Sequence, residues 1–264
     1  MPEKKVIIIG GGPAGVACAV QLKRYGVDPL LIEKETIGGL VKNAWRMDNY
    51  PGYPEGISGS VFAEKLKAHL ERFEVRYQKS EIRNAKFING IFILETNDEK
   101  ISCDILVIAS GTRPRKSTCD NEFTEVFPLL GAKNKKISIV GAGDAAFDYA
   151  MSLCEHNEVH IFNRGDRIKC VPALLKIAEK QKNISYHENS MPVGSFDYTI
   201  FATGREADLD CLSEELKNRL EQLKQDGLLY VIGDVKNGML RQTTVATGDG
   251  LRAAMAITDR IKAE

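Results

Sequence analysis

A glycine-rich turn near the start of the chain constrains the fold more than any other feature. The apolar run 6–9 is typical of a strand buried on both faces, and GGGPAG at 10–15 follows it directly. A helix is expected over 16–25, and a second strand over 29–32 ends at Glu33. The glycines of such a βαβ unit allow a tight turn and a close approach of the backbone to a pyrophosphate. Glu33, about 20 residues further on, stands where an acid takes the ribose hydroxyls of a dinucleotide. The alternative is a βα turn with a structural role only.

The same pattern occurs a second time. A strand is expected over 137–140, GAGDAA follows at 141–146, and alanine in the third glycine place is an accepted variant. A helix over 145–154 and a strand over 159–162 complete the unit. No acid follows this strand, and Arg164 stands in its place. A cation there suits a 2′-phosphate, which favours NADPH; the alternative is a solvated charged loop.

Two such units predict an α/β fold with two Rossmann-like dinucleotide-binding domains. Further buried strands are expected at 105–109 and 196–202, each followed by a small residue and a glycine, and at 228–232 before Gly233-Asp234. Elsewhere the pattern predicts a long loop over 38–59, a helix over 60–73, short antiparallel strands within 75–96 and a last helix over 250–262.

Composition limits the other classes of function. Lysine and arginine total 36, as do aspartate and glutamate, so there is no general attraction to nucleic acid or to an anionic membrane. The 6 cysteines are irregularly spaced and form no C-x-x-C pair, which favours a reducing cytoplasm over a disulfide framework. The first apolar run is too short for a secretory signal, and no stretch reaches the roughly 18 apolar residues of a membrane helix.

The motifs together resemble a known family. The glycine turns are joined in order by NYPGYPEGISG at 49–59, ASG at 109–111, ATG at 202–204, GD at 233–234 and RQTTVATGDG at 241–250. This set resembles the low-molecular-weight thioredoxin reductases and their relatives among the two-domain pyridine nucleotide-disulfide oxidoreductases. The resemblance implies two domains of the three-layer ββα type, with FAD bound by 1–111 and 229–264, NAD(P)H bound by 112–228, and a homodimer.

The resemblance, with the glycine motifs, also implies which residues contact each cofactor. For FAD these are Gly10, Gly12, Pro13, Ala14, Gly15, Glu33, Lys34, Gly39, Leu40, Asn49, Tyr50, Ala109, Ser110, Gly111, Gly233, Asp234, Arg241, Gln242 and Thr243. For NAD(P)H they are Gly141, Gly143, Asp144, Ala145, Ala146, Asn163, Arg164, Arg167, Ala202, Thr203 and Gly204. The four histidines show no metal-ligand spacing, so no metal site is expected.

The chain departs from the family at the redox centre. Thioredoxin reductases carry C-A-T-C-D or a close variant in the nicotinamide domain, whereas this chain has Ser117-Thr118-Cys119-Asp120. Cys119 lacks the partner cysteine that a dithiol relay requires. We therefore read it first as a loop cysteine and second as a redox thiol. The stretch 186–196 is also too short for the usual strand meander of the nicotinamide domain.

These observations predict an FAD-dependent NAD(P)H oxidoreductase that passes electrons to an external acceptor, a small molecule or a redox protein, without a disulfide of its own. One alternative is a thioredoxin or disulfide reductase-like enzyme that works with a dithiol on a partner or with a ferredoxin. Another is a non-catalytic nucleotide-binding subunit or sensor. Trp45 is either a flavin shield or a packing anchor. The lysines at 133, 135 and 136 are either a solvated linker or a docking patch for an acidic electron carrier.

Overall fold

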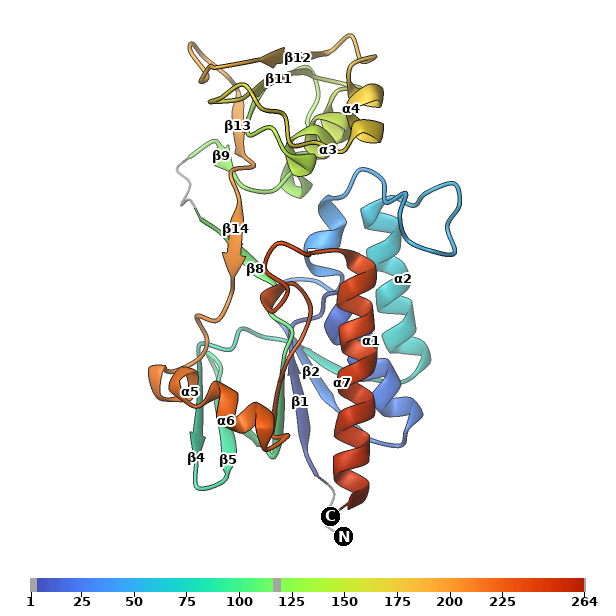
Figure 1. Ribbon diagram of the computed structural model, residues 1–264, viewed down its shortest axis with the longest axis vertical. Coiled ribbons are helices and arrows are strands. Elements are labelled where there is room, and N and C mark those ends of the chain that lie inside the picture. The colour runs from blue at the N-terminus through green and yellow to red at the C-terminus, as the bar shows by residue number, and fades with distance from the viewer. Residues whose placement is uncertain (1–3, 116–119, 264) are drawn as a thin grey trace. The chain divides into compact units, whose positions relative to one another are not determined.

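The computed structural model describes residues 4–115 and 120–263, which form two compact units (Figure 1). Of the described residues, the first unit comprises 4–41, 61–113 and 206–263, and the second comprises 42–60, 114–115 and 120–205. Each unit has its own core and its own parallel sheet. The α/β class with two dinucleotide-binding folds, predicted from the sequence, is confirmed.

Four strands of the first unit's sheet are apolar runs of the sequence. The fifth, at 76–79, is polar and mostly exposed, and it joins the edge of this sheet in parallel, although antiparallel strands were expected within 75–96. All strands of this sheet are parallel, and the residues of β1 and β7 are buried throughout, as expected for a sheet covered on both faces. Helices α1 (Pro13–Arg24) and α7 (Thr243–Ala263) lie side by side against it, and α2 (Gly59–Arg72) runs nearby (Figure 1). The strand order is β15 (Leu229–Val231), β7 (Ile105–Ile108), β1 (Val6–Ile9), β2 (Leu30–Glu33), β3 (Arg76–Lys79).

A three-stranded antiparallel sheet adds a further layer to the first unit. It consists of β4 (Asn84–Ile88), β5 (Ile91–Glu95) and β6 (Lys100–Cys103). Helices α5 (Glu214–Asn218) and α6 (Leu220–Gln225) belong to the same unit, and their Leu216 and Leu223 share a core with Phe92 and Leu94. Residues 206–228, which the sequence analysis assigned to the second domain, therefore pack in the first unit, because their leucines complete this core.

The second unit repeats the parallel arrangement. Its sheet has the order β12 (Ile184–His187), β11 (Glu158–Phe162), β10 (Lys136–Val140), β13 (Tyr198–Phe201), β9 (Glu122–Phe123). Helices α3 (Asp144–Leu153) and α4 (Pro172–Ala178) and the 3₁₀ turn η2 (Phe127–Leu129) accompany it. Residues 188–197, all within the described part, contain no strand, so the meander that the sequence was too short to hold is indeed missing. The three-layer arrangement therefore applies to the first unit.

Two boundaries differ from the sequence expectation. The chain crosses between the units at β8 (Thr112–Pro114) and β14 (Arg205–Ala207), which pair with each other, and not near residues 227–230. Residues 229–231 instead form β15 inside the first sheet. The last helix starts at Thr243, well before the expected residue 250, because Gly250 is a helix-packing residue and not a helix start. Among the described residues, no helix is both long and apolar enough to cross a membrane.

Candidate nucleotide-binding sites

The first glycine turn has the geometry of a phosphate-binding loop. Gly10 has φ of +106°, and a Cβ there would collide with the carbonyl oxygen of Ala109. A Cβ on Gly15 would collide with the carbonyl oxygen of Gly10, so both positions require glycine for packing. Gly12 differs, because nothing lies within 4 Å of the place its Cβ would take. The open space at Gly12, at the N-cap of α1, is where a pyrophosphate approaches in dinucleotide-binding folds.

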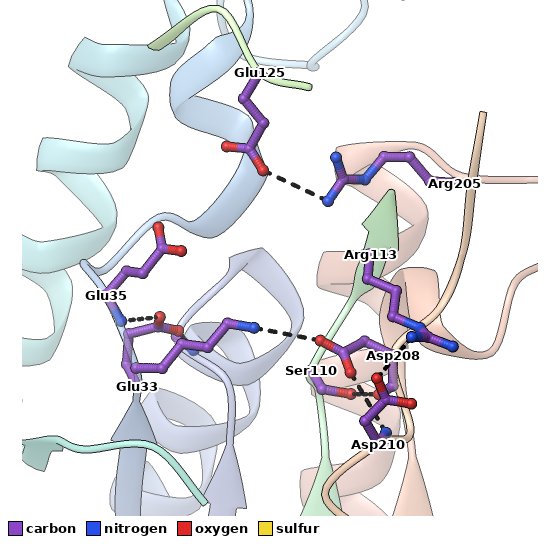
Figure 2. A network of polar contacts seen from close by, with 10 residues as sticks. Glu33, Glu35, Ser110, Arg113, Glu125, Arg205, Asp208 and Asp210 are labelled. Atoms are coloured by element: carbon purple, nitrogen blue, oxygen red, sulfur yellow. Dashed lines mark hydrogen bonds and ion pairs between the residues drawn. The ribbon is translucent and has the colours of Figure 1, made fainter. Parts of the chain in front are cut away.

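Glu33 is held beside this turn (Figure 2). Its Oε2 accepts a hydrogen bond from the backbone N–H of Gly11 at 2.6 Å, and its Oε1 accepts one from the N–H of Glu35 at 2.8 Å. The carboxylate therefore has a fixed place at the carboxyl end of β2, where the ribose of a dinucleotide lies. Gly39 also reaches the turn, since its Cβ would lie 3.3 Å from the Cα of Gly12. Leu40 follows it in the 3₁₀ turn η1 (Gly39–Asn43).

The C-terminal segment returns to the same turn. Gly233 has φ of +73°, and a Cβ there would lie 2.7 Å from the Cβ of Ala14 on α1. A Cβ on Gly250 would collide with the carbonyl oxygen of Ala14, so glycine at both positions lets this segment approach α1. Asp234 lies in the 3₁₀ turn η3 (Gly233–Val235), half-buried next to this contact.

Asp249 is a site residue that the motif reading missed. It is buried on α7, and its Oδ2 accepts hydrogen bonds from the N–H of Gly233 at 3.2 Å and from Asn237 Nδ2 at 2.8 Å. Burial acts to raise the pKa of Asp249, but these hydrogen bonds and Lys236 at 3.4 Å hold it below its ordinary value. The ionised carboxylate thus fixes the turn that carries Asp234. The sequence feature that could have indicated Asp249 is its position between the last two glycines of RQTTVATGDG.

Two predicted FAD residues have partners inside the first unit (Figure 2). The hydroxyl of Ser110 donates to the carbonyl oxygen of Asp208, and Lys34 Nζ lies 3.4 Å from Asp208 Oδ2. Arg113, close by in sequence, forms ion pairs of 2.8 Å with both Glu206 and Asp210. These contacts tie the end of β7 to the chain that returns from β14. Gly111, at φ of +72°, belongs to the same connection, because its carbonyl oxygen accepts from the N–H of Asp208.

The remaining predicted FAD residues fall into two groups. Pro13 and Ala14 open α1, while Arg241, Gln242 and Thr243 lie at the start of α7 in the same unit. Asn49 and Tyr50 belong to segment 42–60, which the structure groups with the second unit. The approach of Asn49 and Tyr50 to a flavin remains a prediction.

The second glycine turn reproduces the first. Gly141 has φ of +146°, and its Cβ would lie 2.6 Å from the carbonyl oxygen of Ala202, which follows β13 as Ala109 follows β7. Ala146 is fully buried, and the space at Gly143 is open to 4 Å, as at Gly12. Asp144 and Ala145 are the first residues of α3, while Thr203 and Gly204 follow Ala202.

Segment 163–171 is fastened onto this turn, which the sequence did not indicate. The N–H of Lys169 donates to the carbonyl oxygen of Ala142 at 2.7 Å, and the N–H of Val171 donates to Asp144 Oδ1 at 2.7 Å. Asn163 braces the segment by donating from Nδ2 to the hydroxyl of Tyr186 at 2.9 Å and to the carbonyl oxygen of Arg167. The segment is therefore a built part of the second site.

Arg164 and Arg167 are exposed on this segment. Neither forms an ion pair with any residue in the described ranges. Two solvated guanidinium groups at the carboxyl end of β11 are thus available to an anion, in the place that the sequence assigned to a 2′-phosphate.

Burial disfavours the thiolate form of the cysteines in the described part of the chain. Burial raises the pKa of the Cys18 and Cys103 thiols to about 12, and that of Cys170 and Cys211 to about 11. Burial also raises the pKa of Cys154. The reactive form of cysteine is the thiolate, which these environments disfavour. Cys119 lies outside the described residues.

Two parallel sheets, each with a glycine turn open at its second glycine, define a protein with two dinucleotide-binding folds. The family model of the pyridine nucleotide-disulphide oxidoreductases matches residues 4–194. The thioredoxin reductase of Chlamydia pneumoniae is 25% identical over 309 residues, covering 97% of this chain and 98% of that protein. That of Bacillus subtilis is 26% identical, covering 97% and 95%.

Solved structures show the same fold. The thioredoxin reductase of Lactococcus lactis matches with a TM-score of 0.85 at 22% identity, covering 99% of this chain and 100% of that chain. The bacillithiol disulfide reductase of Bacillus cereus matches with a TM-score of 0.76 at 18% identity, covering 97% and 99%.

The chain belongs to the pyridine nucleotide-disulphide oxidoreductase family. It is an FAD-dependent NAD(P)H oxidoreductase of the thioredoxin reductase type. The open cradles at Gly12 and Gly143, with a fixed acid at the first turn and exposed cations at the second, fit a flavin dinucleotide and a nicotinamide dinucleotide.

Proposed function

We propose that this protein transfers electrons from NAD(P)H through FAD directly to an external acceptor, without a redox disulfide of its own. The bound cofactors supply the hydride chemistry, from nicotinamide C4 to flavin N5. The chain's own task is then to bind and orient two rings, which needs no acid or base among its side chains.

One observation carries the proposal. Each described cysteine has a thiol pKa raised by burial, and none of these cysteines is disulfide-bonded. A redox-active dithiol has the opposite character, with a thiolate stabilised by a helix N-terminus or a neighbouring cation. The sequence gives Cys119 no neighbour in a C-x-x-C pair.

Within this proposal, the first unit holds FAD. Glu33 accepts hydrogen bonds from the adenosine ribose, and the N–H groups at Gly12 and the start of α1 face the pyrophosphate. Asp234, held by the Asp249 network, approaches the ribityl end. Support comes from the convergence of the β1–α1 turn, Glu33 and η3 in one unit.

The second unit holds the nicotinamide coenzyme, with NADPH preferred. The open backbone at Gly143 takes the pyrophosphate, and Arg164 takes the 2′-phosphate, assisted by Arg167. The support is that both guanidinium groups are exposed and form no ion pair with described residues, so pairing with a phosphate displaces no internal partner.

A second candidate function is favoured by the relatives. Several are named thioredoxin reductases, and one structural neighbour is named a bacillithiol disulfide reductase. In this version the acceptor is a disulfide on a partner, reduced with or without Cys119. In both versions we expect the protein to be a homodimer.

Anaerobic titration of the purified yellow protein separates the two. Direct transfer predicts uptake of two electrons per flavin and turnover with a quinone or ferricyanide. NADPH consumption that depends on thioredoxin or a low-molecular-weight disulfide supports the second version, and loss of that activity in Cys119→Ser would give Cys119 a part in it. A protein whose flavin neither NADPH nor NADH reduces would refute both.

A further inference from the structure

A short segment that continues from the 3₁₀ turn η1 along the chain packs within the second unit. Residues 42–48, called the strap, begin in the last two residues of η1 and lead into Asn49 and Tyr50. The side chain of Trp45 packs against the core of the second unit, which includes the buried residues of α3. The strap and α3 belong to the same compact unit.

Hydrogen bonds fasten the strap at two points. The N–H of Trp45 donates to Asp148 Oδ2 on α3 at 2.9 Å. Asn43, only 4% exposed, donates from Nδ2 to Glu125 Oε2 at 3.1 Å and accepts from the N–H of Phe127 at 3.0 Å. Glu125 is itself held by Arg205 at 3.5 Å (Figure 2).

The carboxylate of Asp148, which accepts the hydrogen bond from Trp45, lies in an environment that disfavours its charged form. Burial raises its pKa to about 6, while the N–H groups of Trp45 and Arg46 lower it and the charges of Asp144 and Asp48 add to the rise. A desolvated carboxylate close to two other acids is unfavourable unless its acceptor role is needed. That role is to capture the backbone of the strap.

The place of Asp148 links the strap to coenzyme binding. Asp148 lies one helical turn after Asp144, on the helix whose N-terminus faces the open space at Gly143. The strap in turn lies between Gly39, which packs against Gly12 of the first turn, and the Asn49–Tyr50 pair. Within the second unit, the strap is therefore joined to α3 through Trp45 and to Glu125 and Phe127 through Asn43.

We propose that Asp148 is a positioning residue, which docks the strap onto α3 and so couples the coenzyme site to the Asn49–Tyr50 segment during flavin reduction. The part of this inference that concerns flavin reduction rests on the proposed function. The docking itself rests only on contacts within the second unit.

The chain contains a single tryptophan, Trp45, so fluorescence excited selectively in tryptophan reports the strap. Acrylamide quenching is measured on the flavin-loaded protein as wild type, Asp148→Ala and Asp148→Asn. The asparagine variant keeps a side-chain oxygen that can accept from Trp45, whereas the alanine variant does not. We expect the quenching constant to rise about threefold or more in Asp148→Ala and to stay near wild type in Asp148→Asn.

Stopped-flow reduction by NADPH supplies the second readout. In Asp148→Ala the rate of flavin reduction should fall about tenfold or more, the scale of one hydrogen bond to a charged group, while the affinity for NADP⁺ stays within about twofold. Glu155→Ala is the matched control, because Glu155 is an exposed acid directly after α3. It should leave both readouts unchanged.

If Asp148→Ala fails to fold, Asn43→Leu tests the other anchor and should show the same two changes. Unchanged quenching and an unchanged reduction rate in either folded variant overturn the inference, as does an equal loss in Asp148→Asn and Asp148→Ala. Failure of NADPH to reduce the wild-type flavin refutes the proposed function instead, and the quenching result still decides whether the strap is docked by Asp148.

Discussion

The backbone N–H of Gly11 donates a hydrogen bond of 2.6 Å to Oε2 of Glu33, about 20 residues further along the chain. This hydrogen bond joins the glycine turn and the acid after the second strand, which are the two sequence features that predicted the first site. Because Glu35 also donates to Glu33, the carboxylate is oriented before any ligand arrives. Preorganisation of this kind reduces the cost of ordering the site when the ligand binds.

Replacing Glu33 should therefore weaken FAD binding. Glu33→Ala removes the proposed charged hydrogen bond to the ribose, which should cost about 1.5–3 kcal/mol of binding free energy, measured by flavin release in an apoprotein reconstitution. Glu33→Gln keeps one acceptor oxygen and should lose less. The flavin released from wild type should be FAD; recovery of FMN alone would contradict the assignment.

Coenzyme preference should depend on Arg164. A guanidinium paired with a 2′-phosphate contributes about 1.5–3 kcal/mol, so Arg164→Glu should raise the Kd for NADPH by roughly 10- to 150-fold and change that for NADH little. Binding is measured by titration of the oxidised protein with NADP⁺ and NAD⁺. A wild type that already prefers NADH would show that Arg164 has no such role.

Electron uptake tests the role of the thiols. A variant with all 6 cysteines replaced by serine or alanine should retain FAD and NADPH-dependent ferricyanide reduction, because each described thiol is held protonated by burial. The single variant Cys119→Ser is the sharper control. If Cys119→Ser loses activity but retains FAD, or if the wild type takes up four electrons per flavin, the results would support a thiol mechanism.

Two glycines of α7 should respond oppositely to alanine. Gly250 packs on α1, where a Cβ would collide with the Ala14 carbonyl oxygen, so Gly250→Ala should destabilise the protein by about 1–3 kcal/mol. Gly248 lies in the same helix with nothing within 4 Å of its Cβ position. Gly248→Ala should stabilise by up to about 1 kcal/mol through helix propensity. Chemical denaturation of both variants gives the two free energies, and destabilisation of equal size would contradict the packing argument.

The free energy of unfolding should depend on pH through the titration of Asp148. Its folded pKa of about 6 exceeds the ordinary aspartate value, so the folded state binds more protons between about pH 4 and pH 6. The contribution of Asp148 to stability is therefore largest below about pH 4 and decreases as the pH rises through 6. Because each pKa unit corresponds to about 1.4 kcal/mol, the change is about 3 kcal/mol at most.

The titration of Asp148 is measured by comparing the free energies of unfolding of wild type and Asp148→Asn over a range of pH. The free energy of unfolding of Asp148→Asn minus that of wild type should increase from about pH 4 to about pH 7. Besides burial, the charges that raise the pKa of Asp148 are Asp144 on its own helix and Asp48 on the strap. The charge of Asp148 in turn raises the pKa of Cys170 before α4. A flat difference across this range would show that Asp148 titrates as an ordinary aspartate.

Local chemistry determined what the sequence could predict. A strand, a turn that only glycine permits and a helix lie within one short stretch, so the turns at Gly10 and Gly141 follow from steric rules that act over a few residues. Glu33 was predictable for the same reason, since the length of one βαβ unit fixes where the next strand ends.

Tertiary structure decided the rest, because it depends on which distant surfaces bury one another. The leucines of 206–228 join the first core and not the second. Trp45, for which the sequence left two roles open, packs as an anchor on the second unit and meets Asp148 across a separation that no periodicity encodes. Asp249 reaches Gly233 only after α7 has packed on α1. Spacing along a chain specifies turns and faces, whereas the partners of those faces are selected by burial in three dimensions.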